Sequence, residues 1–329
     1  MSPTVHGVVF DDPALESAVR NGLDAVEVLL RETVASEYPL LTETSRHLVD
    51  AGGKRFRPLL AILASQLGDP AAAGVVPSAV VVELTHLATL YHDDVMDEAT
   101  MRRGARSANS RWDNTVAILT GDFLFSKASD LLADLGPEAV RIQARTFSRL
   151  VEGQIRETVG VRDGEDPVAH YLKVLVDKTG SLIATSGHFG AMFAGAEPAV
   201  VEALTSYGEQ IGIAFQLSDD LLDVASDSGD SGKTPGTDLR EGIRTLPVLY
   251  ALRDFPGDRL AELLVSDLTD DVRHAEALAL LRTHPAMAAA HDTLIGYADR
   301  AKRLVADLPE GSPRAALEAL ADFVVARTG

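Results

Sequence analysis

The sequence predicts an all-α protein. Apolar residues recur three and four positions apart through most of the 329 residues, as at Leu317, Leu320 and Val324, and this period matches one buried face of an α-helix. We find no convincing run of alternating apolar and polar residues that would indicate β-strands. Breaks rich in glycine, proline and aspartate divide the pattern, and we expect helices between them. These breaks fall at 51–58, 67–74, 135–138, 161–167, 194–198, 226–242, 254–258 and 308–313.

The spacing of these breaks indicates one helical domain. The chain is long enough to bury a large core, although it is near the length at which single cores divide. The helical segments are too evenly spaced to leave an interdomain linker, so we predict a single domain over residues 1–329. The polar segment 226–242 is the exception, because glycine-rich loops of this length in compact domains are usually functional or mobile.

Composition narrows the classes of function. Hydrophobic residues make up 46% and charged residues 24% of the chain, which fits a globular protein. The formal net charge of −19 argues against a nucleic-acid partner, since a phosphate polymer would be repelled. The absence of cysteine excludes disulfides, thiolate metal sites and a cysteine nucleophile. The first residues lack the basic segment and apolar run of a secretory signal, so we expect a cytoplasmic protein.

The clearest functional signal is a group of three aspartates, Asp93, Asp94 and Asp97, near the end of an apolar helical segment. Asp93 and Asp97 are one helical turn apart, and Asp94 neighbours Asp97 on the same side. Like charges this close destabilise a helix unless a cation neutralises them. Magnesium prefers carboxylate oxygens and keeps coordination positions for phosphate oxygens, so we predict a magnesium site here.

A second group of aspartates, Asp219, Asp220 and Asp223, repeats the same spacing, and Gln216 lies one turn before Asp220. A solvated acidic helix end is an alternative explanation for either cluster alone. It explains the pair poorly, because both clusters end helices that are otherwise apolar, where charge without a ligand is costly.

Compact cationic segments accompany the acidic clusters. The segment GGKRFRP places Lys54, Arg55 and Arg57 after two glycines, and MRRG places Arg102 and Arg103 shortly after the first cluster. Arginine and lysine side chains both suit phosphate oxygens. Taken alone, each segment is better explained as a surface patch, and GGKR lacks the spacing of a Walker phosphate-binding loop.

Single residues add weaker signals. Lys178 and Lys233 are candidate phosphate ligands, since each is flanked by glycine and hydroxyl residues. His86 and His92 do not indicate a zinc site, because their separation places them on different helix faces and no thiolate is available. We expect a core or diphosphate-contacting role for His86. For Asp122 in GDFLF we expect helix capping or a buried hydrogen bond.

In this order, the segments GGKRFRP, HDDVMDEATMRRG, GDFLF, DKTGSL, FQLSDDLLD and GKTPGTDLREGIRTLP resemble the trans-isoprenyl diphosphate synthases, also called polyprenyl synthetases. The similarity covers roughly residues 20–325, and the two DDxxD motifs with basic motifs between them are highly specific as an ordered group. The resemblance implies the isoprenoid synthase fold, a helical bundle around a deep central cavity, and a homodimer. It also implies head-to-tail condensation of isopentenyl diphosphate with an allylic diphosphate.

The resemblance further implies roles for individual residues. About three magnesium ions per active site would bridge the allylic diphosphate, held by Asp93, Asp94, Asp97, Asp219 and Asp223. Contacts are implied for Lys54, Arg57, His86 and Arg103 with isopentenyl diphosphate, for Arg102, Lys178 and Lys233 with the allylic diphosphate, and for Thr179 with substrate. Asp220 and Gln216 would support the second motif. We expect the two acidic helix ends to face each other across a shared pocket.

The implied chemistry explains why such a site needs these residues. Magnesium and cationic side chains stabilise the charge that develops on the departing diphosphate. The double bond of isopentenyl diphosphate then attacks the allylic carbocation, and the released pyrophosphate takes the proton that is lost. No general base from the protein is needed.

The helix that carries the first cluster predicts product length. Counting back from Asp93 by one and two turns reaches Thr89 and Thr85, with Ala88 adjacent. In the resembled family, bulky aromatics near these positions stop chain growth, so small side chains here predict a deep channel and a long-chain product. Tyr91 lies on a different helix face and is not counted as the floor. A long apolar product also implies transient peripheral contact with a membrane during release.

Two departures from the family pattern stand out, and three rival functions remain. Many members carry lysine at the position of Ile243, so a diphosphate contact is missing or supplied by Arg244, and the final residues ARTG lack the basic tail of some relatives. The rivals are a short-chain farnesyl or geranylgeranyl diphosphate synthase, a terpene cyclase and a noncatalytic partner subunit. Aromatic residues are only 5% of the chain and both acidic clusters are present, which argues against the last two.

Overall fold

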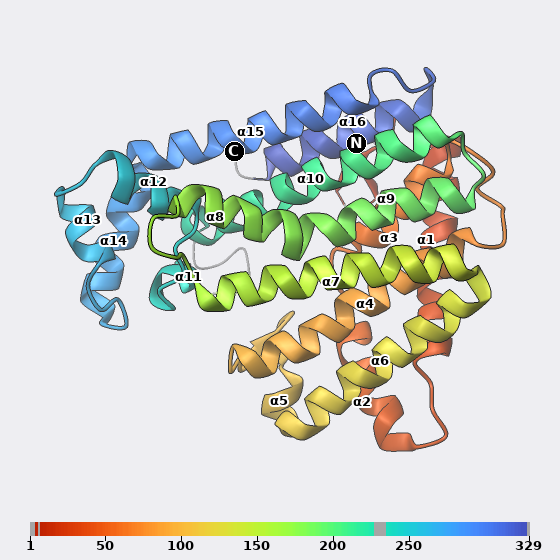
Figure 1. The fold of residues 1–329 in the computed structure, drawn as a ribbon, viewed down its shortest axis with the longest axis horizontal. Coiled ribbons are helices and arrows are strands. Elements are labelled where there is room, and N and C mark those ends of the chain that lie inside the picture. The colour runs from red at the N-terminus through yellow and green to blue at the C-terminus, as the bar shows by residue number, and fades with distance from the viewer. Residues whose placement is uncertain (1–3, 6, 227–234, 328–329) are drawn as a thin grey trace. The chain divides into compact units, whose positions relative to one another are not determined.

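The computed structural model describes residues 4–5, 7–226 and 235–327, and Figure 1 shows their arrangement. The predicted all-α class is confirmed, because helices make up nearly all of the described secondary structure. The first helices are α1 (Pro13–Thr33), α2 (Pro39–Asp50), α3 (Phe56–Ser65), α4 (Val75–Met96), α5 (Ala108–Arg111), α6 (Asn114–Leu135), α7 (Pro137–Val159) and α8 (Pro167–Val174). A π-helix, η1 (Leu175–Gly180), precedes α9 (Ser181–Phe193), α10 (Pro198–Ala225), α11 (Thr237–Arg240), α12 (Leu246–Asp254), α13 (Arg259–Leu264), α14 (Asp271–Thr283), α15 (Pro285–Val305) and α16 (Ser312–Ala326).

Two short hairpins are present that the sequence pattern did not indicate. Strand β1 (Thr4–Val5) pairs antiparallel with β2 (Val8–Val9), and β3 (Met101–Arg102) pairs antiparallel with β4 (Ala105–Arg106). Each strand has two residues, which is too short to show an alternating pattern. The second hairpin matters for function, because it carries the MRRG segment.

Helix boundaries follow local chemistry at the predicted breaks. At the break 161–167, Asp166 caps α8 by accepting the N–H groups of Val168 and Ala169, and Pro167 occupies the first turn, where its missing N–H costs nothing. Two breaks are shorter than predicted: α3 begins at Phe56, inside 51–58, and α11 lies inside 226–242.

The structure divides into two compact units. Unit 1 comprises residues 1–148, 182–208 and 304–319, and unit 2 comprises residues 149–181, 209–303 and 320–329. Because segments of the two units alternate along the chain, the predicted single domain over residues 1–329 stays a prediction.

In unit 1, α4 is the central helix. It packs against α1, α3 and α6, and its middle is buried on nearly all sides, as expected of a helix that is apolar all round. Helix α6 lies close to α4 at Gly121, where a Cβ atom would lie 3.1 Å from the carbonyl oxygen of Ala88 and 2.4 Å from Nε2 of His92. The first acidic cluster lies just beyond this buried part, in the last turn of α4.

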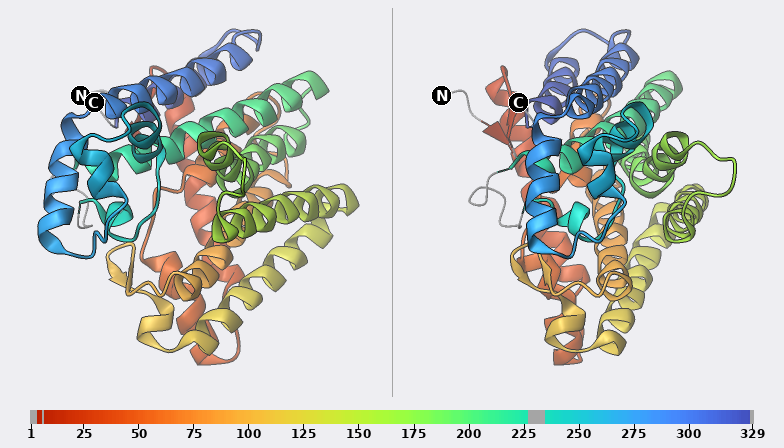
Figure 2. Two further views of the ribbon diagram at one scale, coloured as in Figure 1. Left: turned by 60° about the vertical axis from the view of Figure 1, so that its left-hand side comes forward. Right: turned by 90° about the vertical axis from the view of Figure 1, so that its left-hand side faces the viewer.

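In unit 2, a separate hydrophobic cluster anchors the second acidic helix end. Helices α12, α13 and α14 pack around buried residues that include Val248, Leu260 and Leu281, and Figure 2 shows these helices from two further sides. Val224, next to Asp223 at the end of α10, belongs to the same cluster, as does Leu239 of α11. Among the described helices, none combines the length and hydrophobicity needed to cross a bilayer.

The π-helix η1 interrupts the regular helical path of the segment VLVDKTGS. It carries Lys178 and Thr179, two predicted substrate ligands, and short π-helical turns within α-helices occur frequently at functional sites. Gly153 of α7 makes room for it, since a Cβ atom there would lie 2.6 Å from the backbone nitrogen of Lys178. Close contact between the α7 backbone and η1 therefore depends on this glycine.

We predict that Gly153→Ala lowers the free energy of unfolding by about 1–3 kcal/mol, because the backbones of α7 and η1 must move apart to admit a methyl group. Gly296→Ala is the matched control. Gly296 lies in α15, and a Cβ atom there would be at an ordinary contact distance, 3.6 Å, from Nη1 of Arg300. Alanine should therefore be neutral or stabilising by up to about 1 kcal/mol. Urea unfolding followed by circular dichroism measures both, and a Gly153→Ala protein as stable as the wild type would contradict the prediction.

Candidate active site

The first acidic cluster lies at the C-terminal end of α4. Asp93 is in the last turn and half-buried, whereas Asp97 is the C-cap residue and is exposed. The C-terminal end of a helix carries partial negative charge, which adds to that of the carboxylates. A cation is therefore strongly favoured at this helix end.

Asp94 has a different environment from Asp93 and Asp97. It is fully buried, and its Oδ1 accepts a hydrogen bond of 2.6 Å from Nε of Arg102. Burial raises the pKa of Asp94, and the positive charge of Arg102 opposes that shift. Its Oδ2 has no hydrogen-bond partner in the part of the chain that the structure describes. Asp94 thus anchors the β3–β4 hairpin from inside the protein.

The two basic segments meet at buried Glu83 of α4. Nη1 of Arg55 donates to Glu83 over 2.8 Å, and Arg55 also pairs with Glu27 and with the carbonyl oxygen of Val49. Arg103 lies 3.9 Å from Glu83 and donates to the carbonyl oxygens of Leu48, at 3.0 Å, and Gly52. Arg55 therefore holds the GGKRFRP segment in place, and the bonds of Arg103 join the hairpin to the same region.

His86 of α4 is surrounded by positive charge. Burial and the nearby guanidinium groups of Arg57, Arg103, Arg102 and Arg55 hold the pKa of His86 well below its usual value. His86 is therefore a neutral imidazole within a basic cluster, as a diphosphate-contacting residue could be. Lys54, the remaining predicted ligand of isopentenyl diphosphate, is exposed in the loop before α3.

The predicted chain-length residues differ in exposure. Thr85 and Ala88 are fully buried, and Oγ1 of Thr85 accepts a 2.7 Å hydrogen bond from Gln143 of α7. Thr89 is partly exposed, and its hydroxyl donates to the carbonyl oxygen of His86. Tyr91 points away from this face, since its hydroxyl donates to the carbonyl oxygen of Thr44. Of the three small side chains, Thr89 is the one that a growing chain could touch without repacking.

The expectation for Asp122 of α6 was wrong. Asp122 lies in the interior of α6 and is exposed, so it neither caps the helix nor forms a buried hydrogen bond. Its carboxylate instead lies 3.5 Å from Nε2 of His92, which also contacts the carbonyl oxygen of Ile118 at 3.1 Å. The period of the sequence could not separate the exposed face of α6 from the face that packs on α4.

In unit 2, Asp220 is the buried member of the second cluster. Its carboxylate accepts hydrogen bonds from the hydroxyl of Tyr171 and, at 2.9 Å, from Nε2 of Gln216. Burial raises the pKa of Asp220 to about 6, while these hydrogen bonds lower it. The hydroxyl of Thr179 donates to Oε1 of the Gln216 amide at 3.4 Å. Thr179, Gln216 and Asp220 thus form one hydrogen-bonded chain.

The outer members of the second cluster also have partners within the protein. Asp219 forms an ion pair with Arg327, the residue that follows α16. Asp223 accepts the backbone N–H groups of Thr237 at 3.3 Å and Asp238 at 3.1 Å, at the start of α11. Lys233, a predicted ligand of the allylic diphosphate, lies outside the described residues.

Several contacts in unit 2 involve residues that carried no signal in the sequence. Lys178 forms an ion pair of 2.5 Å with Glu157 of α7, and Asp220 is held by Tyr171 of α8. These pairs join residues far apart in the chain, so no local spacing indicates them. Ile243, which replaces a lysine of the family pattern, is exposed beside exposed Arg244.

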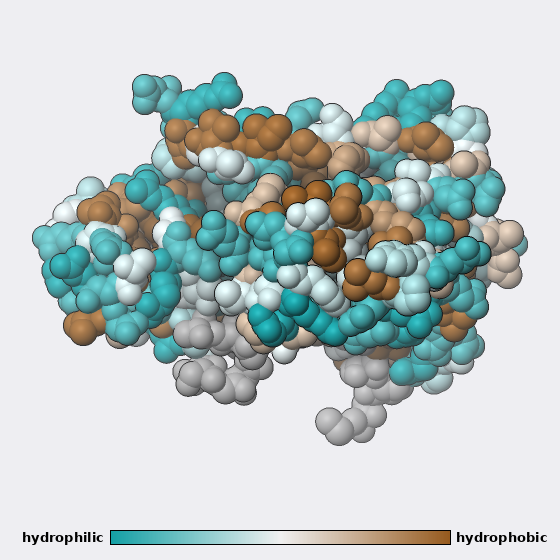
Figure 3. Space-filling view, turned by 90° about the horizontal axis from the view of Figure 1, so that it is seen from below, coloured by the Kyte–Doolittle hydropathy of each residue, from teal (hydrophilic) through white to brown (hydrophobic). Residues whose placement is uncertain are grey.

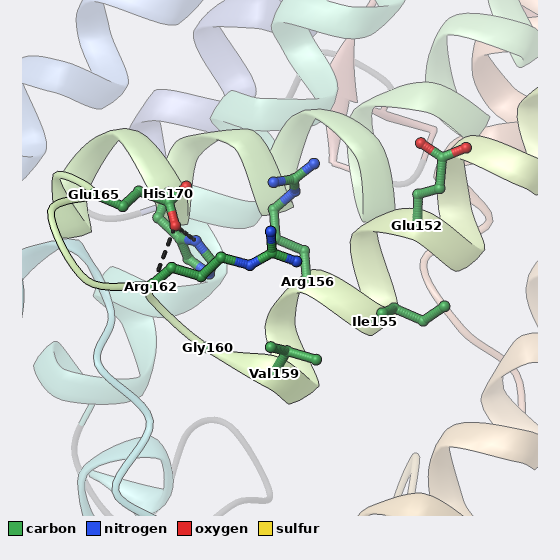
Figure 4. Close-up of a pocket in the computed structure, with 8 residues that line it drawn as sticks. All are labelled: Glu152, Ile155, Arg156, Val159, Gly160, Arg162, Glu165 and His170. Carbon is green, nitrogen blue, oxygen red and sulfur yellow. Dashed lines mark hydrogen bonds and ion pairs between the residues drawn. The ribbon is translucent and has the colours of Figure 1, made fainter.

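A cavity of about 330 Å³ lies on another face of α7 (Figure 4). Figure 4 shows Arg156 and Arg162 extending into it, with His170 hydrogen-bonded to Glu165 at 3.0 Å on one side. None of the predicted site residues lines this cavity. The cavity therefore shares no lining residue with the acidic and basic clusters.

The donor sets fit a hard divalent cation. Asp93 and Asp97 offer carboxylate oxygens one turn apart at a negatively charged helix end. Within the described residues, no three histidine, aspartate or glutamate side chains converge as a complete ligand set. Magnesium usually binds through one or two carboxylates together with water and substrate phosphates, so an incomplete protein shell fits this ion.

Comparison with known proteins identifies the family of this chain. Residues 38–281 match the polyprenyl synthetase family. The chain is 51% identical to the nonaprenyl diphosphate synthase of Mycobacterium tuberculosis, over 99% of this chain and 98% of that protein. It is 36% identical to heptaprenyl diphosphate synthase component 2 of Geobacillus stearothermophilus, over 94% and 97% of the two chains.

A solved structure also shares the fold. It is a geranylgeranyl pyrophosphate synthase from Corynebacterium glutamicum complexed with calcium and isoprenyl diphosphate. It superposes with a TM-score of 0.87 at 46% identity, over 98% of this chain and 100% of that one. These findings confirm the resemblance carried by the sequence motifs: the chain belongs to the polyprenyl synthetase family.

Proposed function

We propose that this protein is an all-trans long-chain polyprenyl diphosphate synthase. It condenses isopentenyl diphosphate head to tail, in successive steps, with an allylic diphosphate. The observation that carries the proposal is the pair of aspartate clusters, each at the C-terminal end of an apolar helix, together with a basic cluster around neutral His86. The names of the nonaprenyl and heptaprenyl relatives support a long product.

Asp93, Asp97, Asp219 and Asp223 are the residues best placed to hold magnesium, because each is more accessible than the buried middle aspartate of its cluster. Magnesium would neutralise charge on the diphosphate as it leaves. Asp94 was predicted as a ligand too, but its burial and its bond to Arg102 favour an indirect role. The calcium in the C. glutamicum complex supports a divalent cation. The proposal includes magnesium as the ion, with about three ions per site. It also includes the action of both clusters on one diphosphate.

Cationic residues would orient the two substrates. Arg102 and Lys178 each pair with a carboxylate, Asp94 and Glu157, and keep further N–H groups that can donate to the allylic diphosphate. Around His86, the positive charges of Arg57 and Arg103 suit the diphosphate of isopentenyl diphosphate. Holding the double bond beside the allylic carbon converts a bimolecular reaction into one between positioned groups.

The direct test is to incubate the pure protein with isopentenyl diphosphate, several allylic primers and magnesium, and to size the dephosphorylated products. We expect long products from the wild type and roughly 100-fold slower turnover for Asp93→Asn, which removes a charge that would hold magnesium. Asp134→Asn, an equally conservative change at an exposed position of α6, should match the wild type.

The assay also separates the rival functions. Products that stop at farnesyl or geranylgeranyl length would identify a short-chain synthase. This rival is tested because the similar C. glutamicum protein is a geranylgeranyl pyrophosphate synthase. A wild-type protein that elongates no primer would overturn the proposal and favour a cyclase or a noncatalytic subunit.

We predict that Thr89→Phe shortens the product. Thr89 is the partly exposed member of the three chain-length residues, so an aromatic ring there should obstruct a growing chain rather than disrupt the α4–α6 interface. Thr89→Ser keeps a small side chain and should retain the wild-type length. Unchanged product length in Thr89→Phe, measured by radiolabelled product sizing, would refute the assignment of the channel to this face.

A homodimer is a further part of the proposal. In unit 1, α6 exposes Ile118 and Leu119, the latter by 59%, and α7 exposes Val140. Hydrophobic side chains gather in patches on the face seen in Figure 3. Exposed apolar patches of this kind mark interaction surfaces. A cytoplasmic location, with transient membrane contact as a long apolar product leaves, completes the proposal.

We expect Leu119→Asp to shift the protein from dimer to monomer, because a buried charge without a partner opposes association. Val272→Asp is the control, since Val272 of α14 is 76% exposed and lies outside the proposed interface. Sedimentation velocity measures the masses. A dimer that persists in Leu119→Asp would place the interface elsewhere.

A further inference from the structure

The C-terminal end of the chain contacts the second acidic cluster. Helix α16 ends at Ala326, and the guanidinium of the next residue, Arg327, forms an ion pair with Asp219. The same guanidinium lies 4.7 Å from the ring centroid of Phe215, one turn before Asp219 on α10. All these residues belong to unit 2. A residue in the final turn of the chain therefore holds one of the proposed metal ligands.

The Arg327 side chain is unusually enclosed for an arginine near a chain end. It is 11% exposed, whereas the side chain of Asp219 is 34% exposed. Its Nη1 is buried and has no hydrogen-bond partner among residues 4–5, 7–226 and 235–327. A buried donor without a partner is costly. The attraction of Asp219 and the contact with Phe215 must offset that cost.

Negative charge around Asp219 explains the attraction. Asp220 and Asp223 lie within one turn on the same helix, and all three are close to the C-terminal end of α10. Arg327 supplies a positive charge at this place. A divalent cation would satisfy the same demand, but it would be repelled by a guanidinium bonded to the same carboxylate. The two cations therefore compete for Asp219.

We propose that Arg327 is a positioning residue that occupies Asp219 until a divalent cation binds, and that cation binding releases the C-terminal residue from α10. The inference rests on the proposed role of Asp219 as a metal ligand. It gives a role to the residue that follows α16, because the state of the second metal site is transmitted to the end of that helix.

The test is calorimetric titration of the full chain with magnesium chloride in the absence of substrate. Arg327→Gln removes the competing charge and should bind magnesium roughly three- to tenfold more tightly than the wild type, which corresponds to loss of one charge-assisted contact. Arg327→Lys keeps the charge and should stay close to the wild type. Lys302→Gln is the matched control, because it removes a cation of the same unit from an exposed pair with Asp322.

Unchanged or weaker magnesium binding by Arg327→Gln would overturn the inference, since it would mean that Arg327 only orients Asp219. Hydrogen exchange of the wild type gives an independent readout that needs no variant. Amides at the end of α16, residues 324–327, should exchange faster when magnesium is added, and equal or slower exchange would overturn the proposed release.

The outcomes separate this inference from the proposed function. A wild-type protein that elongates primers, with an affinity for magnesium that Arg327→Gln does not raise, removes only the role of Arg327. An affinity that rises in Arg327→Gln, in a protein that elongates nothing, supports the competition for Asp219 and removes only the synthase activity.

Discussion

Carboxylates at the C-terminal ends of two apolar helices need positive charge or hydrogen-bond donors close by, and the surroundings of each cluster supply them. The helix ends add their own negative charge to that of the aspartates. In both clusters the middle aspartate is buried and held by protein groups, Arg102 for Asp94 and Tyr171 with Gln216 for Asp220. The outer aspartates are more accessible. The DDxxD spacing thus gives each motif one buried aspartate and two more accessible ones.

The basic half of the site depends on backbone conformations that are rare for residues with side chains. Arg55, Glu98 and Arg103 all have positive φ angles, of 45°, 50° and 52°. They lie in or beside the GGKRFRP and MRRG segments, and such conformations persist where surrounding contacts determine them. Arg55 and Arg103 have those contacts, in Glu83 and in backbone carbonyl groups. These unfavourable backbone conformations lie in and beside the two segments, GGKRFRP and MRRG, whose cationic side chains surround His86.

Much of the fold followed from the sequence because its signals are local. Apolar periodicity and the breaks rich in glycine, proline and aspartate predicted the helices, and the aspartate spacing predicted both helix-end clusters. The two-residue hairpins and the π-helix were missed, since neither changes the apolar period over enough residues to be seen. The burial of Asp94, the exposure of Asp122 and the structural role of Arg55 depend on which helix face meets a neighbour. That information is not local.

The partners of the site residues were missed for the same reason. Glu157 with Lys178, Tyr171 with Asp220 and Arg327 with Asp219 are each separated by 21 or more positions in the chain. A single glutamate, tyrosine or arginine carries no pattern of its own. Only the packing of α7, α8 and α16 brings these side chains to the motifs.

The π-helix has a consequence for how this chain can vary. A π-helical turn accommodates an extra residue within an α-helical path, and each residue of an α-helix advances the side-chain direction by about 100°. Removing one residue from 175–180 would return the segment to regular α-helix and change the directions of the side chains within it. Lys178 and Thr179 would then face different neighbours. The directions of Lys178 and Thr179 therefore depend on the number of residues in this segment.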